Sequence, residues 1–196
     1  MAIEIADHGA RNRVEIAPDV LADGVGEIII TGDDSQVVIG AGVRLAGAKI
    51  QLGNRCSFTA AANSNLAKIQ VFAKTEGRAS IGALTAFTMD SRLWLHEPGA
   101  ITIGERCIIA SLTLLTVSDM HSIFDLESGE RINPPRDVIV EDDVWLGREA
   151  MLLKGAHVGR GSVIGLRAVV TGAIPPHCIA AGIPARVIRE NVRWQQ

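Results

Sequence analysis

Five histidines in this chain are candidates for acid–base chemistry, because histidine titrates near neutral pH and can accept or donate a proton. His121 differs from the others in its surroundings. It lies in the segment 118–136, which is rich in acidic residues and contains Gly129 and two adjacent prolines, and loops of this kind carry catalytic residues more often than regular elements do. We therefore take His121 as a candidate general base. Asp119 and Asp125 are candidates for orienting its second ring nitrogen, although each equally fits a turn-forming carboxylate.

The other four histidines are expected to be mainly structural. His8 lies near the N-terminus, and His177 lies in a Pro-Pro-His-Cys turn. His157 is expected on the solvated surface. His96 follows Trp94 by two residues and is the one member of this set that can line a groove.

Composition narrows the classes of function. The 196 residues carry a formal net charge of −3 and are 47% hydrophobic, which argues against a nucleic-acid-binding protein and against wholesale disorder. No apolar run is long enough for a transmembrane helix, and the first residues do not resemble a signal peptide. The three cysteines are an odd number, which fits reduced thiols in a cytoplasmic protein better than a disulfide framework.

The elements that must position His121 follow a six-residue repeat. From residue 140, every first position is aliphatic: Val140, Leu146, Leu152, Val158, Ile164 and Val170. The fifth positions are mostly small, and glycine follows several of the aliphatics. The same pattern returns upstream, with slips, to about residue 37. A six-residue period predicts a short strand followed by a tight corner, so that three sides close a triangular coil of about 18 residues and successive coils pair in parallel. The aliphatic points inward, the small residue fits the corner, and the glycine relieves the bend.

Two stretches interrupt the repeat and define the organisation of the chain. The segment 118–136 is predicted to be a loop that leaves the prism, and segment 185–191 is predicted to be a short strand or helix that closes one end. We therefore expect a single all-β domain, residues 1–196, built as a parallel β-helix. Its parts are N-terminal coils (1–117), an active-site loop (118–136), regular hexads (137–175) and a C-terminal cap (176–196).

Four segments of the second half resemble the hexapeptide-repeat acyltransferases, above all the bacterial O-acetyltransferases of galactosides, maltose and surface polysaccharides. They are Val144-Trp145-Leu146-Gly147, the hexads at 158–165, the run 169–176 that ends in Pro175-Pro176, and Ala181-Gly182-Ile183-Pro184 with the residues that follow to 189. The resemblance implies a left-handed parallel β-helix, a handedness that spacing alone does not give. It also implies a homotrimer in which acetyl-CoA lies in the groove between neighbouring prisms.

The resemblance assigns roles to individual residues. The family's catalytic histidine falls at the interruption that holds His121, and its orienting carboxylate can come from Asp119, from Asp125 or from another subunit. Trp145, beside Gly147, is expected to contact the pantetheine arm or the next subunit.

Other positions match those that hold the rest of the coenzyme. Leu166 and Thr171 match positions that contact the thiol end and the pantetheine, and Arg189 matches a position that meets the phosphates. The family usually has a lysine where this chain has Gly172, and Arg167 is a candidate to replace that charge.

We therefore expect an acetyl-CoA-dependent O-acetyltransferase that acts on a hydroxyl of a sugar or surface-polysaccharide precursor by direct attack, with no metal. An amino-sugar N-acetyltransferase is the alternative with the same base and groove. A zinc hydratase like the γ-type carbonic anhydrases is disfavoured because no two histidines are five residues apart. A non-catalytic scaffold or binding protein is disfavoured because it would not need the loop with His121. A covalent acetyl-cysteine is disfavoured because Cys56, Cys107 and Cys178 are expected to be structural.

Overall fold

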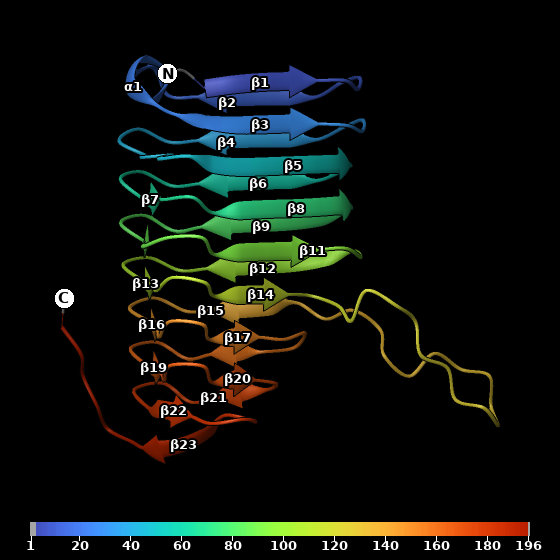
Figure 1. Ribbon diagram of the computed structural model, residues 1–196, viewed down its shortest axis with the longest axis vertical. Coiled ribbons are helices and arrows are strands. Elements are labelled where there is room, and N and C mark those ends of the chain that lie inside the picture. Colours follow the sequence, from blue (N-terminus) through green and yellow to red (C-terminus); the bar gives the residue numbers. More distant parts are fainter. Residues whose placement is uncertain (1–2, 196) are drawn as a thin grey trace.

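The chain is a parallel β-helix in which successive coils stack along one axis (Figure 1). The computed structural model describes residues 3–195. Three parallel sheets form the three faces of a prism. One further strand pairs antiparallel at the C-terminal end. The all-β parallel architecture predicted from the hexads is confirmed.

Each coil visits the three sheets in turn. Sheet A contains β1 (Ile3–Asp7), β3 (Gly26–Ile30), β5 (Ala48–Asn54), β8 (Gln70–Thr75), β11 (Arg92–Leu95), β14 (Leu114–Thr116), β17 (Met151–Leu152) and β20 (Val169–Val170). Sheet B contains β2 (Arg13–Ile16), β4 (Gln36–Ile39), β6 (Ser57–Ala60), β9 (Gly77–Ile81), β12 (Gly99–Ile103), β15 (Val138–Val140), β18 (His157–Val158) and β21 (Ala173–Ile174). Sheet C contains β7 (Asn65–Leu66), β10 (Ala86–Phe87), β13 (Ile108–Ile109), β16 (Trp145–Leu146), β19 (Val163–Ile164), β22 (Ile179–Ala181) and β23 (Arg186–Arg189).

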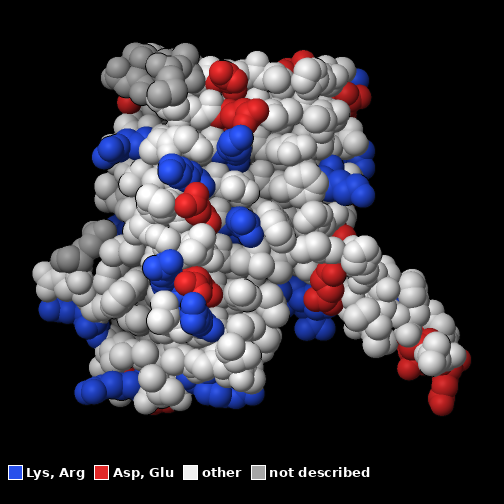
Figure 2. Space-filling model, viewed as in Figure 1, with Lys and Arg blue, Asp and Glu red and all other residues white. Residues whose placement is uncertain are grey.

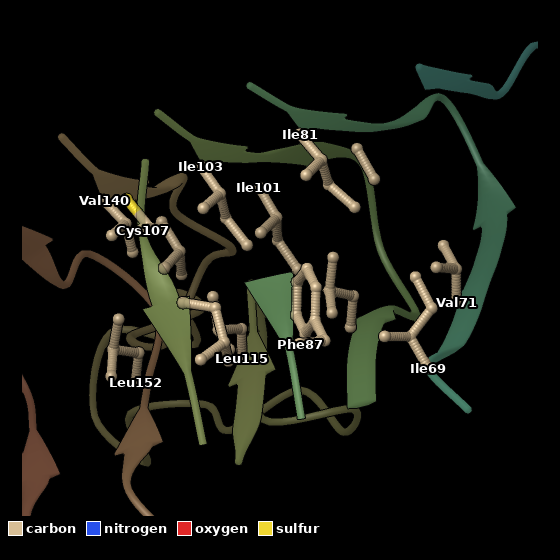
Figure 3. Packing of buried hydrophobic residues seen from close by; sticks show 14 of the residues in the cluster. Ile69, Val71, Ile81, Phe87, Ile101, Ile103, Cys107, Leu115, Val140 and Leu152 are labelled. Carbon is tan, nitrogen blue, oxygen red and sulfur yellow. The ribbon is translucent and has the colours of Figure 1, made fainter. Parts of the chain in front are cut away.

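The core fills the inside of the prism with aliphatic side chains. All six first-position residues from Val140 to Val170 are buried, and so are small residues at the fifth positions, such as Ala150 and Ser162. Residues from all three faces meet along the axis, as Phe87 of sheet C, Ile101 of sheet B and Leu115 of sheet A do in Figure 3. The expected inward and corner positions of the hexad are therefore confirmed.

The predicted coil length holds only for the C-terminal half. There Leu152 pairs with Val170, one predicted coil further along the chain. In the N-terminal half Leu93 pairs with Leu115, which makes that coil longer than predicted. The longer coils carry additional residues in their sheet A and sheet B strands, as in the buried pair Leu93 and Leu95. Because side chains in a strand alternate with a period of two, lengthening a strand by two residues keeps the same residues inward.

The predicted role of the repeat glycines is also corrected. At one corner the left-handed bend is made mostly by non-glycine residues, such as Leu84 (φ 61°), Arg106 (φ 55°) and Asp143 (φ 58°), and not by the glycine that follows the aliphatic residue. Gly82 lies outside that conformation. A Cβ on it would lie 2.4 Å from the carbonyl carbon of Gly104 in the next coil, so the glycine is required by close stacking of coils.

The two ends of the prism differ. The N-terminal end carries a helix that the sequence analysis did not predict, α1 (Pro18–Asp23), which begins with a proline as helices often do. At the other end, the segment predicted to be a strand or helix is strand β23, antiparallel to β22. No helix within residues 3–195 combines the length and apolarity needed to span a membrane.

Candidate active site

The loop that carries His121 leaves the prism at the corner between sheets A and B. Strand β14 ends at Thr116 and strand β15 begins at Val138. The coil that contains the loop is the longest of those described, because the two coil neighbours Arg106 and Asp143 are separated by 37 positions in the sequence. Figure 1 shows the loop, in yellow, extending away from the prism and down beside the narrower C-terminal coils.

His121 is held by its backbone and presents its ring to solvent. Its N–H donates to the carbonyl oxygen of Asp119 at 2.8 Å, and its own carbonyl oxygen accepts from the Asn133 amide at 2.8 Å. The side chain is exposed. Among residues 3–195, no group hydrogen-bonds to the ring, so both ring nitrogens are open to a second molecule.

Asn133 is the central contact of the loop base. Only 6% of it is exposed, and its amide group bridges both ends of the loop. Nδ2 donates to the Asp119 carboxylate at 2.9 Å as well as to His121, and Oδ1 accepts from the Ile123 N–H at 2.6 Å. The structure uses its polar atoms within the loop, and the sequence does not reveal this because Asn133 and His121 are not close neighbours in the chain.

The two aspartates that were candidates for orienting His121 have other partners. Asp119 accepts from Lys154 and from Asn133, and these two contacts lower the pKa of its carboxyl group. Asp125 accepts the N–H groups of Ser128 and Glu127 at 2.8 and 3.0 Å, so it stabilises a turn, and the pKa of its carboxyl group is lowered by those contacts. Neither aspartate contacts the His121 ring within its own chain.

A bidentate ion pair joins the returning half of the loop, which contains Arg131, to the preceding coil. The Arg131 guanidinium contacts both carboxylate oxygens of Glu97, at 2.7 and 2.9 Å. This pairing lowers the pKa of Glu97. Glu97 lies one coil above the loop at the same corner, so the ion pair fixes the direction in which the loop leaves.

Trp145, a candidate for contacting the coenzyme, lies on sheet C. Its side chain is 42% exposed, and its ring centroid lies 6.1 Å from that of Trp194 in the C-terminal tail. Trp194 is held by its indole N–H, which donates to the Asp143 carbonyl oxygen at 2.6 Å. Gly147, at the end of the same strand, has no room for a side chain, because a Cβ would lie 2.7 Å from the Ile164 carbonyl oxygen.

The remaining candidate coenzyme residues are exposed but not all on the same side. Leu166 and Arg167 lie at the corner between sheets C and A, where Leu166 is 64% exposed and Arg167 pairs with Glu149 at 2.6 Å. Arg189 lies on β23, opposite Ile179 at the edge of sheet C. Thr171 lies at the corner between sheets A and B, below the loop.

The geometry of the prism separates His121 from Trp145. In a triangular prism, the corner between sheets A and B is opposite sheet C. His121 projects from that corner and Trp145 lies on that opposite face, as Figure 1 shows by the loop on one side and β16 on the other. One copy of the chain therefore does not bring these two side chains together.

The cysteines and His157 are buried or in contact with other groups of the prism. All three cysteines are buried, and burial raises the pKa of Cys107 to about 11. His157, expected on the solvated surface, is partly exposed and lies 2.8 Å from Glu141 through Nε2. Within residues 3–195, no three His, Cys, Asp or Glu side chains are arranged to hold a metal ion.

Comparison with known proteins places this architecture among acetyltransferases. The chain is 30% identical over 192 residues to a polysialic acid O-acetyltransferase of Neisseria meningitidis, a match that covers 96% of this chain and 88% of that protein. It is 39% identical over 94 residues to a polysialic acid O-acetyltransferase of Escherichia coli O1:K1. That second match covers 48% of this chain and only 31% of the relative's length. No protein-family model matches the chain.

Solved structures agree with the sequence comparison. The polysialic-acid-specific acetyltransferase NeuO superposes with a TM-score of 0.77 at 29% identity, covering 100% of this chain and 89% of that one. A galactoside acetyltransferase in complex with coenzyme A superposes with a TM-score of 0.50 at 29% identity, over 58% of this chain and 55% of that one. The predicted left-handed β-helix and the predicted use of acetyl-CoA are confirmed by these relationships. The chain is an acetyltransferase and belongs to the hexapeptide-repeat acyltransferase family.

Proposed function

We propose that the protein transfers an acetyl group from acetyl-CoA to a hydroxyl group of a polysaccharide, at a site formed between neighbouring copies of the chain in a homotrimer. The polysaccharide acceptor is supported by the two polysialic acid O-acetyltransferases that the chain resembles. The observation that carries the shared site is the placement of His121 and Trp145 on opposite sides of the prism.

The surface of the loop supports contact with a second copy. Three large hydrophobic side chains of the loop project into solvent, with Phe124 57% exposed, Ile132 61% exposed and Leu126 fully exposed. Exposed apolar surface of this density marks an interaction site. When the loop corner of one chain packs on sheet C of the next, the contact is heterologous, and three such contacts close a ring.

Sheet C and the C-terminal end have the surface that a coenzyme A molecule requires. Trp145 and Leu166 offer exposed apolar contacts for the pantetheine arm. Arg186 and Arg189 are exposed on β23, and Figure 2 shows basic side chains at this end of the prism. Guanidinium groups bind phosphate oxygens in fixed geometry, so this end suits the nucleotide phosphates.

His121 supplies the acid–base chemistry in this proposal. A ring nitrogen accepts the proton of the acceptor hydroxyl as its oxygen attacks the thioester carbonyl carbon. The tetrahedral intermediate then collapses, the carbon–sulfur bond breaks, and the proton passes from His121 to the leaving thiolate. The products are the acetyl ester and free coenzyme A, with no covalent enzyme intermediate.

Mixing two impaired variants, assayed at an acetyl-CoA concentration that does not saturate Trp145→Ala, tests both the base and the shared site. His121→Ala is expected to lower acetyl transfer about 100-fold or more, the usual contribution of a general base, while CoA affinity measured by calorimetry stays unchanged. Trp145→Ala is expected to weaken CoA binding. If one chain supplies His121 and its neighbour supplies Trp145, trimers reassembled from equal amounts of the two variants contain intact sites, and activity returns to about a quarter of the wild-type value.

Two outcomes contradict the proposal. Full turnover by His121→Ala removes this residue as the base. Absence of rescue in mixed trimers, shown by light scattering to have formed, removes the shared site. The control mixture combines His121→Ala with wild type, where activity must follow the wild-type fraction.

A further inference from the structure

A groove of about 580 Å³ lies on the outer face of sheet A beside the base of the loop, and the function proposed above does not use it. It crosses strands β3, β5, β8 and β11. Its walls include Phe72, Trp94 and His96, together with the loop residue Met120. Because Met120 directly precedes His121, a molecule bound in this groove lies next to the candidate base.

The floor of the groove is an aromatic platform. Phe72 on β8 and Trp94 on β11 are paired in the sheet. Both side chains point outward, because the residues that flank each of them in its strand, such as Leu93 and Leu95, are buried. The ring of His96 packs on both, with centroids 4.8 Å from Phe72 and 5.7 Å from Trp94. These rings form a partly exposed surface in an otherwise aliphatic protein with 4% aromatic residues.

His96 is a neutral member of this platform. Burial lowers its pKa, and the nearby charge of Lys74 lowers it further. A neutral imidazole both donates and accepts hydrogen bonds, so it can bind hydroxyl groups at neutral pH.

Cations flank the platform on two sides. Arg92 and Lys74 lie on the same outward faces of β11 and β8, and the Arg92 guanidinium lies 5.6 Å from the Trp94 ring centroid. Lys49, at the groove wall, is already paired with Glu27 at 3.0 Å. The ion pairs found within residues 3–195 include neither Arg92 nor Lys74, which leaves both charges available to a ligand.

We propose that this groove is the acceptor subsite and that it binds an acidic saccharide chain, with sugar rings stacked on the aromatic platform and sugar carboxylates paired with the flanking cations. The inference rests on the proposed function and specifies its substrate. The apolar C–H face of a sugar ring packs on aromatic rings, while its hydroxyl groups need polar partners such as His96. The combination of stacking surface and cations distinguishes an acidic sugar from a neutral one.

The test measures acetyl transfer to polysialic acid fragments at saturating acetyl-CoA. Trp94→Ala is expected to raise the KM for the fragments about ten-fold with kcat unchanged, because the platform binds substrate and transition state equally. Trp94→Phe keeps a ring and is expected to remain within about two-fold of the wild-type KM. Val38→Ala, which removes an outward apolar group from another groove on sheet B, is the matched control and leaves KM unchanged.

The charges are tested separately with the double variant Arg92→Gln and Lys74→Gln. We expect its KM for the fragments to rise and the salt dependence of KM to weaken, because fewer charges are screened. Arg78→Gln, on the outward face of β9 in sheet B, is the control. A neutral glucan and polyglutamate serve as competitors. Each is expected to inhibit more weakly than sialic acid oligomers, since the first lacks carboxylates and the second lacks sugar rings.

The outcomes separate this inference from the function on which it rests. If the wild-type protein transfers acetyl groups to no saccharide, the proposed function fails. If it does so and Trp94→Ala keeps the wild-type KM while melting normally, the acceptor subsite is not here. If Trp94→Ala instead changes the oligomeric state in light scattering, a second copy covers the groove, and the inference is overturned.

Discussion

Asn133 offers a sharp test of how the structure positions His121. The substitution Asn133→Asp changes one NH2 group into an oxygen and leaves the shape of the side chain intact. In the wild-type protein that NH2 group donates to the Asp119 carboxylate at 2.9 Å and to the His121 carbonyl oxygen at 2.8 Å. The variant loses both donors and places a second carboxylate against Asp119.

The expected cost follows from these two contacts. A neutral hydrogen bond contributes about 1 kcal/mol, and one to a charged group about 1.5–3 kcal/mol. Their loss destabilises the closed loop base by about 3 kcal/mol, which increases the open population about 100-fold. Lys154, which pairs with Asp119, offsets part of the repulsion between the two carboxylates. Asn133→Ala loses the same donors and one acceptor but adds no charge.

Hydrogen exchange and kinetics measure the effect. The His121 amide, which donates to the Asp119 carbonyl oxygen, is expected to exchange faster in Asn133→Asp, and kcat is expected to fall as the open population grows. Asn191→Asp, an exposed position in the cap, is the control for added charge. If exchange at the loop base is the same in Asn133→Asp as in the wild type, the amide of Asn133 does not hold the loop, and the reasoning is refuted.

Three further predictions concern the loop and the core. The pKa values of the Asp119 and Glu97 carboxyl groups are lowered in the folded protein, so their ion pairs stabilise it fully at pH values above the ordinary pKa values of 3.8 and 4.5. This stabilisation is lost as the pH falls through the lowered pKa values, and limited proteolysis should then detect release of the loop. A loop that stays protected in acid contradicts the role of the ion pairs. Because burial raises the pKa of Cys107 to about 11, iodoacetamide at pH 8 should leave it unmodified in the folded protein and modify it after denaturation; rapid labelling of the folded state would contradict this burial. Leu146→Ala should lower the free energy of unfolding by about 2–5 kcal/mol, against about 0.5 kcal/mol for the exposed Leu166→Ala, as measured by urea denaturation; equal losses would show that position 146 is not a core site.

The regular part of the fold could be predicted because its rule is local. An aliphatic residue at every sixth position and a small residue four positions later follow from the geometry of a single side of the prism. Val140, Leu146 and Val158 are therefore all buried as expected. The longer N-terminal coils were not predicted because two additional residues in a strand shift the six-residue spacing while the alternation of inward and outward side chains is kept. The repeat there looks irregular in the sequence, although each coil is only longer.

The candidate site was less predictable because its contacts join residues that are distant in sequence. The loop and His121 could be located from the interruption of the repeat. The partners of Asp119 are Asn133, 14 residues away, and Lys154, 35 residues away. Trp94 and His96 form a platform with Phe72 only because neighbouring coils stack in register. Which residues become such neighbours depends on the coil length, and the length predicted from the hexad spacing was wrong for this half of the chain.

The way the coils differ in size has a consequence for how proteins of this shape can change. Removing Leu93 alone would turn Leu95 to solvent and Trp94 into the core, and every later residue of that side would be reversed. Removing two residues from that strand and two from its sheet B partner would convert a wide coil of the N-terminal kind into a narrow one of the C-terminal kind, with every remaining side chain facing as before. The circumference of the prism can thus change in steps of two residues per strand without changing which side chains face the core. In this chain the step from wide to narrow coils occurs at the loop, so the outer surface above His121 is broader than the surface beneath it.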